Sequence, residues 1–296
     1  QVLMKASPLA AFDLVRATVE VLNEPLGEVY EFLNVVFDVY APVVDLASPQ
    51  RALMDEHAGG ELADDDARAI AVFVAGAFFG ASSQLLALCA PDPFALSPAW
   101  DGDRLVGHGT SIMVYCDIFM LFFVNLLTYF DSDDGAALVR AVTSLALELV
   151  VTDWPSLATQ GLAVIETLFQ YTAGPEAESY LESMPSEAFY HQLLVPLAGE
   201  VGPAAVAAAL HCVFFVTGGA ARVEDLIEQM YYSQRDQFQA WLHAALANVD
   251  DLLLTTDDKR RIMTSLFDAH LPSRPVSKIF SDLGALVAAR SASAPR

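Results

Sequence analysis

The sequence predicts an all-α fold, an α-solenoid (superhelix) in which antiparallel helix hairpins stack on one another. Apolar residues recur with the period of an α-helix along nearly the whole chain, and the alternation typical of strands is rare. Proline and side chains suited to capping stand at the front of many periodic segments. Most connections are short, which makes consecutive helices antiparallel neighbours.

The N-terminal half contains long periodic segments. Pro8 and Pro25 stand at the front of the first two, where the missing amide hydrogen costs nothing. The stretches 69–90 and 112–130 are apolar nearly all round, as expected for helices buried between neighbouring helices. We expect helices at 8–23, 25–46, 62–89, 110–130 and 134–151, with longer connections at 47–61 and 91–109.

The C-terminal half has clearer start signals. Pro155 and Pro203 stand at the front of periodic segments, and Asp153 and Ser186 are suited to N-cap positions. The residues at 255–258 place hydroxyls and carboxylates where a helix dipole favours them. We expect helices at 154–172, 175–184, 186–199, 203–216, 222–232, 234–249, 257–269 and 276–290, and a frayed tail at 291–296.

The helices pair into units of about 35 to 45 residues, a length typical of HEAT repeats. We therefore expect residues 1–290 to form a single HEAT-like array, with a compact helical bundle as the alternative. The chain opens at Gln1 in mid-pattern without an initiator Met. We interpret it as the C-terminal portion of a longer protein.

The charge is strongly lopsided. The 296 residues include 38 Asp and Glu against 15 Lys and Arg, a formal net charge of −23, and 54% of residues are hydrophobic, which disfavours disorder. A surface this negative repels nucleic-acid phosphates and the anionic face of a membrane, and it attracts basic protein segments. We expect basic protein cargo as the partner, and neither nucleic acid nor membrane.

Cysteines and hydropathy bear on the environment of the chain. Cys89, Cys116 and Cys212 are an odd set that gives no disulfide framework, so we expect buried free thiols. The mean hydropathy of +0.41 leaves a membrane-embedded helical protein as an alternative. Asp117 and Asn125 near the middle of the second apolar stretch disfavour it. We expect these two side chains to be buried, hydrogen-bonded bridges between hairpins.

No motif that carries chemistry is complete in the sequence. Phosphate-binding loops, dinucleotide fingerprints, nucleophile elbows and zinc-protease motifs do not occur, and the histidines lack ligand spacing. The segment 107–111 precedes a predicted helix but lacks the lysine of phosphate loops. The acidic segments 64–66 and 131–134 match the magnesium motifs of terpene cyclases only in part. We expect no enzyme, no metal and no cofactor; a magnesium-dependent all-α enzyme of terpene-cyclase type remains the leading alternative.

The same acidic segments are the candidate contacts for basic cargo. They are chosen because their carboxylates are clustered, which raises the local negative potential. The residues are Asp64, Asp65, Asp66, Asp131, Asp133 and Asp134.

The C-terminal third carries a more specific pattern. The pattern begins with Val223, Asp225 and Leu226. It continues at helical spacing with Arg235, Phe238, Trp241 and Leu242, and it ends with Phe280, Asp282 and Leu283. This order resembles the C-terminal end of the karyopherin-β nuclear transport receptors, in the branch of transportin-SR and importin-thirteen.

The resemblance implies the C-terminal part of a HEAT-repeat receptor that carries protein cargo and shuttles between nucleus and cytoplasm. It implies nucleoporins as partners and Ran-GTP bound through a missing N-terminal part. Asp225, Arg235, Phe238, Trp241 and Leu242 would be structural residues of the family pattern. The chain lacks the arginine-rich helix that the transportin-SR members use for phosphorylated cargo, which puts phosphorylation-dependent cargo choice in doubt.

Overall fold

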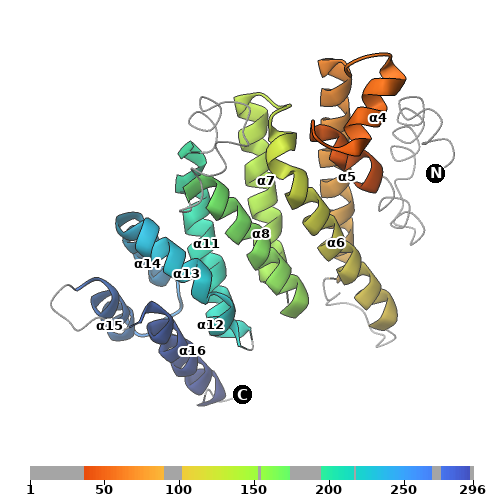
Figure 1. Cartoon of the computed structure of the whole chain (residues 1–296). Coiled ribbons are helices and arrows are strands. Elements are labelled where there is room, and N and C mark those ends of the chain that lie inside the picture. Colours follow the sequence, from red (N-terminus) through yellow and green to blue (C-terminus); the bar gives the residue numbers. More distant parts are fainter. Residues whose placement is uncertain are drawn as a thin grey trace. The chain divides into compact units, whose positions relative to one another are not determined.

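The computed structural model describes residues 37–89, 102–152, 155–173, 195–216, 218–268 and 275–293; within them every regular element is a helix (Figure 1). This confirms the all-α prediction for the described part of the chain. The chain divides into two compact units, Gln1–Gly135 and Ala136–Arg296. The predicted helices at 8–23 and 175–184, most of 25–46, and the Asp153 and Ser186 caps lie outside the described residues.

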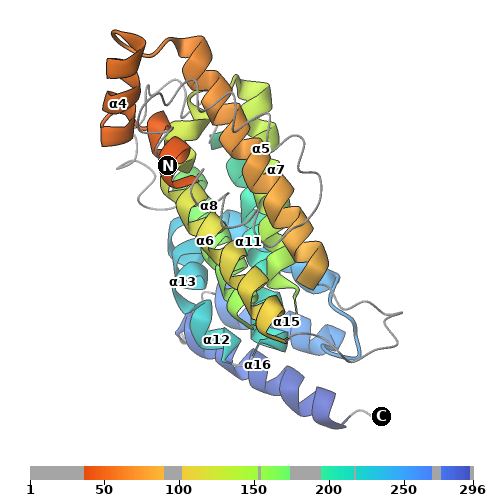
Figure 2. The ribbon, with the colours of Figure 1, turned by 90° about the vertical axis from the view of Figure 1, so that its right-hand side faces the viewer.

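Two long helices form the centre of the first unit. Helices α5 (Asp64–Cys89) and α6 (Gly102–Leu127) run antiparallel and side by side, as Figures 1 and 2 show. Phe78 of α5 stacks on Phe119 of α6, with ring centroids 4.0 Å apart and an angle of 4° between the planes. The 3-10 helix η1 (Ala41–Val44), whose residues are all buried, packs against both long helices. The stacked rings of Phe78 and Phe119 thus join the two long helices of this unit.

Two segments predicted as connections are helical. Residues 47–61 contain α4 (Pro49–Ala58), where the hydroxyl of Ser48 accepts a hydrogen bond from the amide of Arg51 at 3.0 Å. Gly59 ends this helix with a φ of +78°, which glycine adopts without strain. Helix α6 begins at Gly102 and not at residue 110, so the segment 107–111 is helical and not a loop. The glycines in the first turns of α6 lower its helix propensity, so the sequence pattern did not indicate a helix there.

The second unit begins with three long helices. They are α7 (Ser132–Val150), whose first turn precedes the unit boundary, α8 (Pro155–Ala173) and α11 (Val195–Phe215). Helix α8 packs on α11. It also crosses α7 closely at Gly161, because a Cβ there would lie 2.5 Å from the carbonyl oxygen of Ala146. Only glycine permits this approach of the two backbones.

Helix α11 corrects the prediction of separate helices at 186–199 and 203–216. Residues 195–215 form one helix with Pro203 inside it. Proline removes one backbone hydrogen bond, and α11 offsets this loss by packing against α8, α12, α14 and α16. Among the described helices, the segment Pro196–Phe215 alone is long and apolar enough to cross a membrane, and 61% of its most apolar window is buried inside the structure. A core helix of a soluble protein passes the same test, so this finding is weak evidence for a membrane span.

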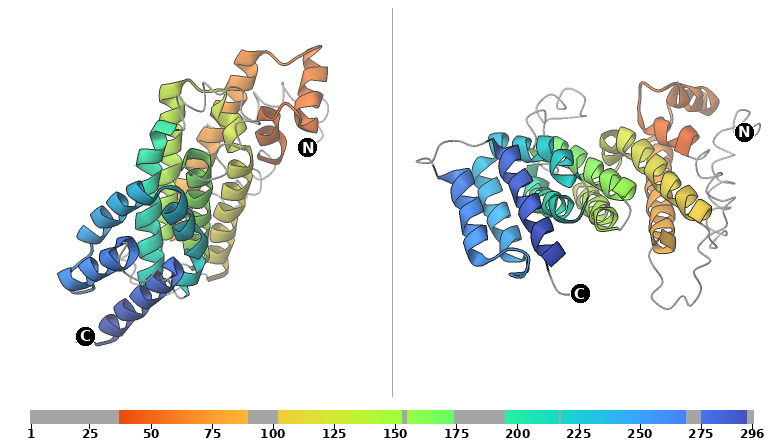
Figure 3. Two further views of the ribbon diagram at one scale, coloured as in Figure 1. Left: turned by 60° about the vertical axis from the view of Figure 1, so that its left-hand side comes forward. Right: turned by 90° about the horizontal axis from the view of Figure 1, so that it is seen from below.

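Further helices follow α11, and the last of them lie side by side in the right-hand panel of Figure 3, which is seen from below. The helix predicted at 222–232 is present as α13, which begins just after Val223, and the short helix α12 that precedes it was not predicted. Thr255 and Asp258 form a reciprocal capping box at the start of α15, as the hydroxyls and carboxylates there suggested. The elements are α12 (Gly219–Arg222), α13 (Glu224–Ser233), α14 (Arg235–Ala247), α15 (Thr256–Phe267) and α16 (Val276–Ser293).

Predictions for single polar residues and thiols had mixed outcomes. Asp117 is exposed and Asn125 is partly exposed, so neither is the buried bridge that we predicted. Both lie on a side of α6 that also exposes Leu121, away from the layer that includes Phe119. Cys116 and Cys212 are buried free thiols, as expected.

Candidate protein-binding surfaces

The structure brings the six candidate aspartates into one region of the first unit. Asp64, Asp65 and Asp66 form the first turn of α5, while Asp133 and Asp134 lie in the first turn of α7 and Asp131 precedes it. All six are exposed. One Nη atom of Arg68 lies 3.9 Å from a carboxylate oxygen of Asp131 and 3.9 Å from one of Asp134. We call these six aspartates and Arg68 the acidic helix-end cluster.

The position of this cluster has a local physical reason. Carboxylates in the first turn of a helix interact favourably with the positive end of its dipole. Asp131 also accepts a hydrogen bond from the amide of Asp134 at 2.9 Å, which caps α7. Across the described residues, no group of three or more His, Cys, Asp or Glu side chains is arranged to hold a metal ion. The cluster therefore offers a negative, solvated surface with a single arginine.

A second acidic feature lies in the second unit, between α8 and α13. It is a groove of about 650 Å³, which we call the α8–α13 groove. Its polar lining comes from one face of α8 and one face of α13. On each helix the lining positions are separated by three, four or seven residues, which places them on the same side of the helix. The lining residues are Glu166, Gln170, Asp225, Glu228, Gln229, Tyr232 and Ser233.

The charge of this groove is not compensated within the described part of the chain. Burial, and then the nearby charge of Asp225, raise the pKa of Glu166 above its usual value. No ion pair among the described residues includes Glu166, Asp225 or Glu228. The amide oxygen of Gln229 is buried and accepts no hydrogen bond. The groove thus presents three carboxylates that have no basic partner among the described residues.

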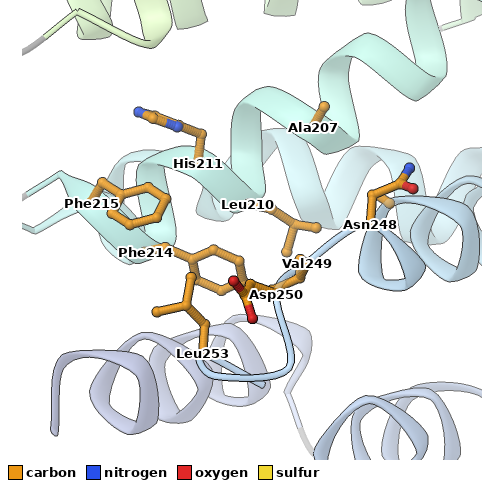
Figure 4. A pocket seen from close by; sticks show the side chains of 10 residues that line it. Ala207, Leu210, His211, Phe214, Phe215, Asn248, Val249, Asp250 and Leu253 are labelled. Carbon is orange, nitrogen blue, oxygen red and sulfur yellow. The ribbon is translucent and has the colours of Figure 1, made fainter. Parts of the chain in front are cut away.

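A third concave feature is an apolar pocket of about 340 Å³ between α11 and the segment that follows α14 (Figure 4). Leu210, Phe214, Val249 and Leu253 supply much of its lining. Burial lowers the pKa of His211, whose ring centroid lies 4.9 Å from that of Phe215. Figure 4 shows the His211 ring pointing away from Asp250, so these two groups do not form an acid–base pair.

The five residues of the family pattern separate into two environments. Phe238 and Leu242 of α14 are fully buried, and the indole of Trp241 lies against Gly202 of α11. Asp225 is exposed and lines the α8–α13 groove, while the guanidinium carbon of Arg235 lies 5.2 Å from the ring centre of Tyr231. The aromatic members pack α14, and the charged members lie at the surface.

Sequence reading missed Glu166, Glu228 and Gln229. A signal was present in α13, where Asp225, Glu228, Gln229 and Tyr232 follow a helical period on a polar face. The packing that places this face near Glu166 of α8 is a tertiary feature without a local signal. Comparison with known proteins found no matching family model, no matching curated protein and no matching solved structure.

Proposed function

We propose that the chain is a protein-binding segment of a nuclear transport receptor of importin or transportin type, and that it binds basic protein cargo through acidic surfaces. The observation that carries this proposal is the excess of negative over positive charge on those surfaces. The acidic helix-end cluster contains six exposed aspartates and one arginine. The resemblance of the segment from Val223 to Leu283 supplies the receptor class, and with it shuttling between nucleus and cytoplasm.

The proposed architecture is a HEAT-like array of antiparallel hairpins over residues 1–290. Its support is local. Helices α5 and α6 form an antiparallel pair, and close packing of α8 on both α7 and α11 buries a central helix from two sides. Each middle helix of an α-solenoid is covered in this way by its neighbours. Such an array leaves one helix of every hairpin with a face free for a partner.

Negative surfaces of this kind act mainly on association. Complementary charge steers a basic partner toward the surface and raises the association rate more than it raises the affinity of each contact. Dissolved salt screens this attraction, with a Debye length of about 10 Å at 0.1 M and about 3 Å at 1 M. Binding that depends on the acidic surfaces must therefore weaken as salt increases.

The experiment measures the affinity of the chain for a basic peptide rich in Lys and Arg, by fluorescence anisotropy, at about 0.1 M and about 1 M salt. We expect a loss of about tenfold or more in affinity between these conditions, and no binding of an acidic peptide of equal length. The double variant Asp65→Asn/Asp133→Asn should bind more weakly than Glu56→Gln/Asp236→Asn, which removes the same charge at exposed positions elsewhere. Equal affinity at both salt concentrations would contradict the proposal.

The proposal includes no catalytic role for the aspartates of the cluster. A magnesium-dependent terpene cyclase would use such carboxylates to hold the metal ions that bind a diphosphate. Turnover of isoprenoid diphosphates with Mg²⁺, measured in the absence of detergent, distinguishes the two functions. Activity that Asp131→Ala abolishes would establish the enzyme and overturn the binding proposal.

A further inference from the structure

The α8–α13 groove combines three properties that point to one kind of ligand. The first is negative charge: Glu166, Asp225 and Glu228 line it, and within the described residues none of them has a lysine or arginine partner. Like charges placed this close disfavour one another. A cation in the groove would relieve that repulsion.

The second property is an unused hydrogen-bond acceptor. Gln229 lines the groove, and its side-chain amide oxygen is buried and has no hydrogen-bond donor among the described residues. Buried polar atoms in folded proteins nearly always have a hydrogen-bond partner. This oxygen is independent of the carboxylates, and a ligand that donates hydrogen bonds would satisfy it if the Gln229 amide turned toward the groove.

The third property is an aromatic ring at the surface of the groove. Tyr232 is 72% exposed and lines the groove. Its neighbour Tyr231 already holds a guanidinium, that of Arg235, at 5.2 Å from the ring centre. Cations bind aromatic faces at this distance. The exposed ring of Tyr232 is thus suited to the same contact with a cation from outside the chain.

We propose that the α8–α13 groove binds an arginine side chain of a basic protein partner. Arginine carries five N–H donors in a planar fork, so one guanidinium can donate to the carboxylates while its face lies on Tyr232, and a Gln229 amide turned toward the groove can accept from it as well. Lysine is a compact charge with three donors and stacks less well. A metal ion fits less well, because the carboxylates of the described residues form no coordinating group. This inference rests on the proposed function and names the partner group at one specific place.

The test compares three peptides of identical sequence except at their basic positions, which hold arginine, lysine or citrulline. Citrulline has the shape of arginine without its charge. We expect the chain to bind the arginine peptide several-fold more tightly than the lysine peptide, and the citrulline peptide least. The variant Glu166→Gln/Glu228→Gln should lose about tenfold in affinity for the arginine peptide. The exposed control Glu56→Gln/Asp236→Asn should keep the preference for arginine.

A second variant separates recognition from bulk charge. Tyr232→Ala changes no charge and alters an exposed side chain, so the fold is retained; it should remove most of the preference for arginine over lysine. Unchanged arginine preference in both variants would overturn the groove as the binding site, while salt-sensitive binding would leave the proposed function intact. Failure of the wild-type chain to bind either basic peptide would overturn both.

Discussion

The indole of Trp241 on α14 lies against the backbone of Gly202 on α11, so closely that a Cβ at position 202 would be 2.3 Å from a ring carbon. Real Cβ atoms do not approach other atoms at this distance. The contact therefore requires glycine at 202, and it brings the C-terminal helices onto the central helix of the second unit.

Gly202→Ala should destabilise the protein. The added methyl group displaces the indole or separates α11 from α14, at a cost of about 1–3 kcal/mol, as is usual when a packed core is overfilled. Gly199→Ala in the same helix is the matched control, because that position is open and a Cβ meets no atom within 4 Å. The control should stabilise by about 0.5–1 kcal/mol, as alanine does in a helix. Urea denaturation measures both, and equal effects of the two substitutions would contradict the structure.

Arg290→Ala should release the C-terminal helix α16 from α15. The Arg290 guanidinium lies 2.7 Å from a carboxylate oxygen of the mostly buried Asp258 and donates to the carbonyl of Leu253 at 2.9 Å. Removing hydrogen bonds to a charged group costs about 1.5–3 kcal/mol. Lys278→Ala breaks an exposed pair on the same helix, with Asp282 at 3.0 Å, and should cost less than about 1 kcal/mol.

The same pair gives a dependence on pH. Hydrogen bonds from Thr255, and then from Arg290, lower the pKa of Asp258. The stability that this carboxylate contributes is therefore present above its unfolded pKa of about 3.9 and is lost as the pH falls through the lowered folded value. The difference in unfolding free energy between wild type and Arg290→Ala should shrink below about pH 4. A difference that stays constant down to strongly acidic pH would exclude this role of Asp258.

Arg51→Met should destabilise the first unit strongly. Arg51 is 2% exposed and donates to Asp55 at 3.0 Å, to the hydroxyl of Tyr129 at 3.0 Å and to the carbonyl of Leu62 at 3.4 Å. Its removal leaves acceptors unpaired, which costs about 3 kcal/mol or more. Arg51→Lys keeps the charge but not the fork, so it should have an intermediate effect.

An exposed arginine provides the control for Arg51. Arg260 pairs with Asp257 at 2.6 Å at the surface, and Arg260→Met should cost less than about 1 kcal/mol. Thermal unfolding followed by circular dichroism ranks the three variants. Equal melting temperatures for Arg51→Met and Arg260→Met would contradict the network.

Cys116 and Cys212 should resist alkylation in the native protein. Burial, and then the charge of Asp117, raise the pKa of Cys116 to about 12, and burial raises that of Cys212 to about 11. The thiolate is the reactive form, so at pH 8 both should react with iodoacetamide at least about a hundredfold more slowly than in urea. Peptide mass spectrometry measures each site. Rapid labelling of Cys116 without denaturant would show that α6 opens locally.

The sequence predicted the helices best where start signals and apolar period agree. The capping box of Thr255, the proline at the start of α8 and the beginning of α16 at Val276 all lie where expected. Helix α4 was missed although Ser48 before Pro49 and Gly59 after Ala58 are standard start and stop signals. Its apolar residues do not repeat regularly enough to indicate a helix. Pro203 led to the opposite error, a helix boundary predicted where there is none. Proline usually marks the start of a helix, but Pro203 lies inside α11.

The candidate surfaces were less accessible to sequence reading. The adjacency of 64–66 and 131–134 could not be read from the chain, since it depends on how α5 and α7 begin beside one another around Arg68. The α8–α13 groove was missed because its two sides are far apart in sequence. Glu166 differs from other surface glutamates only through its tertiary surroundings, which bury it beside Asp225. A local pattern cannot reveal that effect.

Pro203 gives α11 two unlike sides at the same level of the helix. Proline has no amide hydrogen, so the carbonyl of Gly199 one turn earlier is left to water on a side where both residues are exposed. On the other side the neighbouring Gly202 is held by the indole of Trp241. Bending of α11 should therefore be concentrated at this turn, with the Gly202 side held in place by Trp241. Amide hydrogens near Pro203 should exchange with solvent faster than those in the rest of α11, which is otherwise protected.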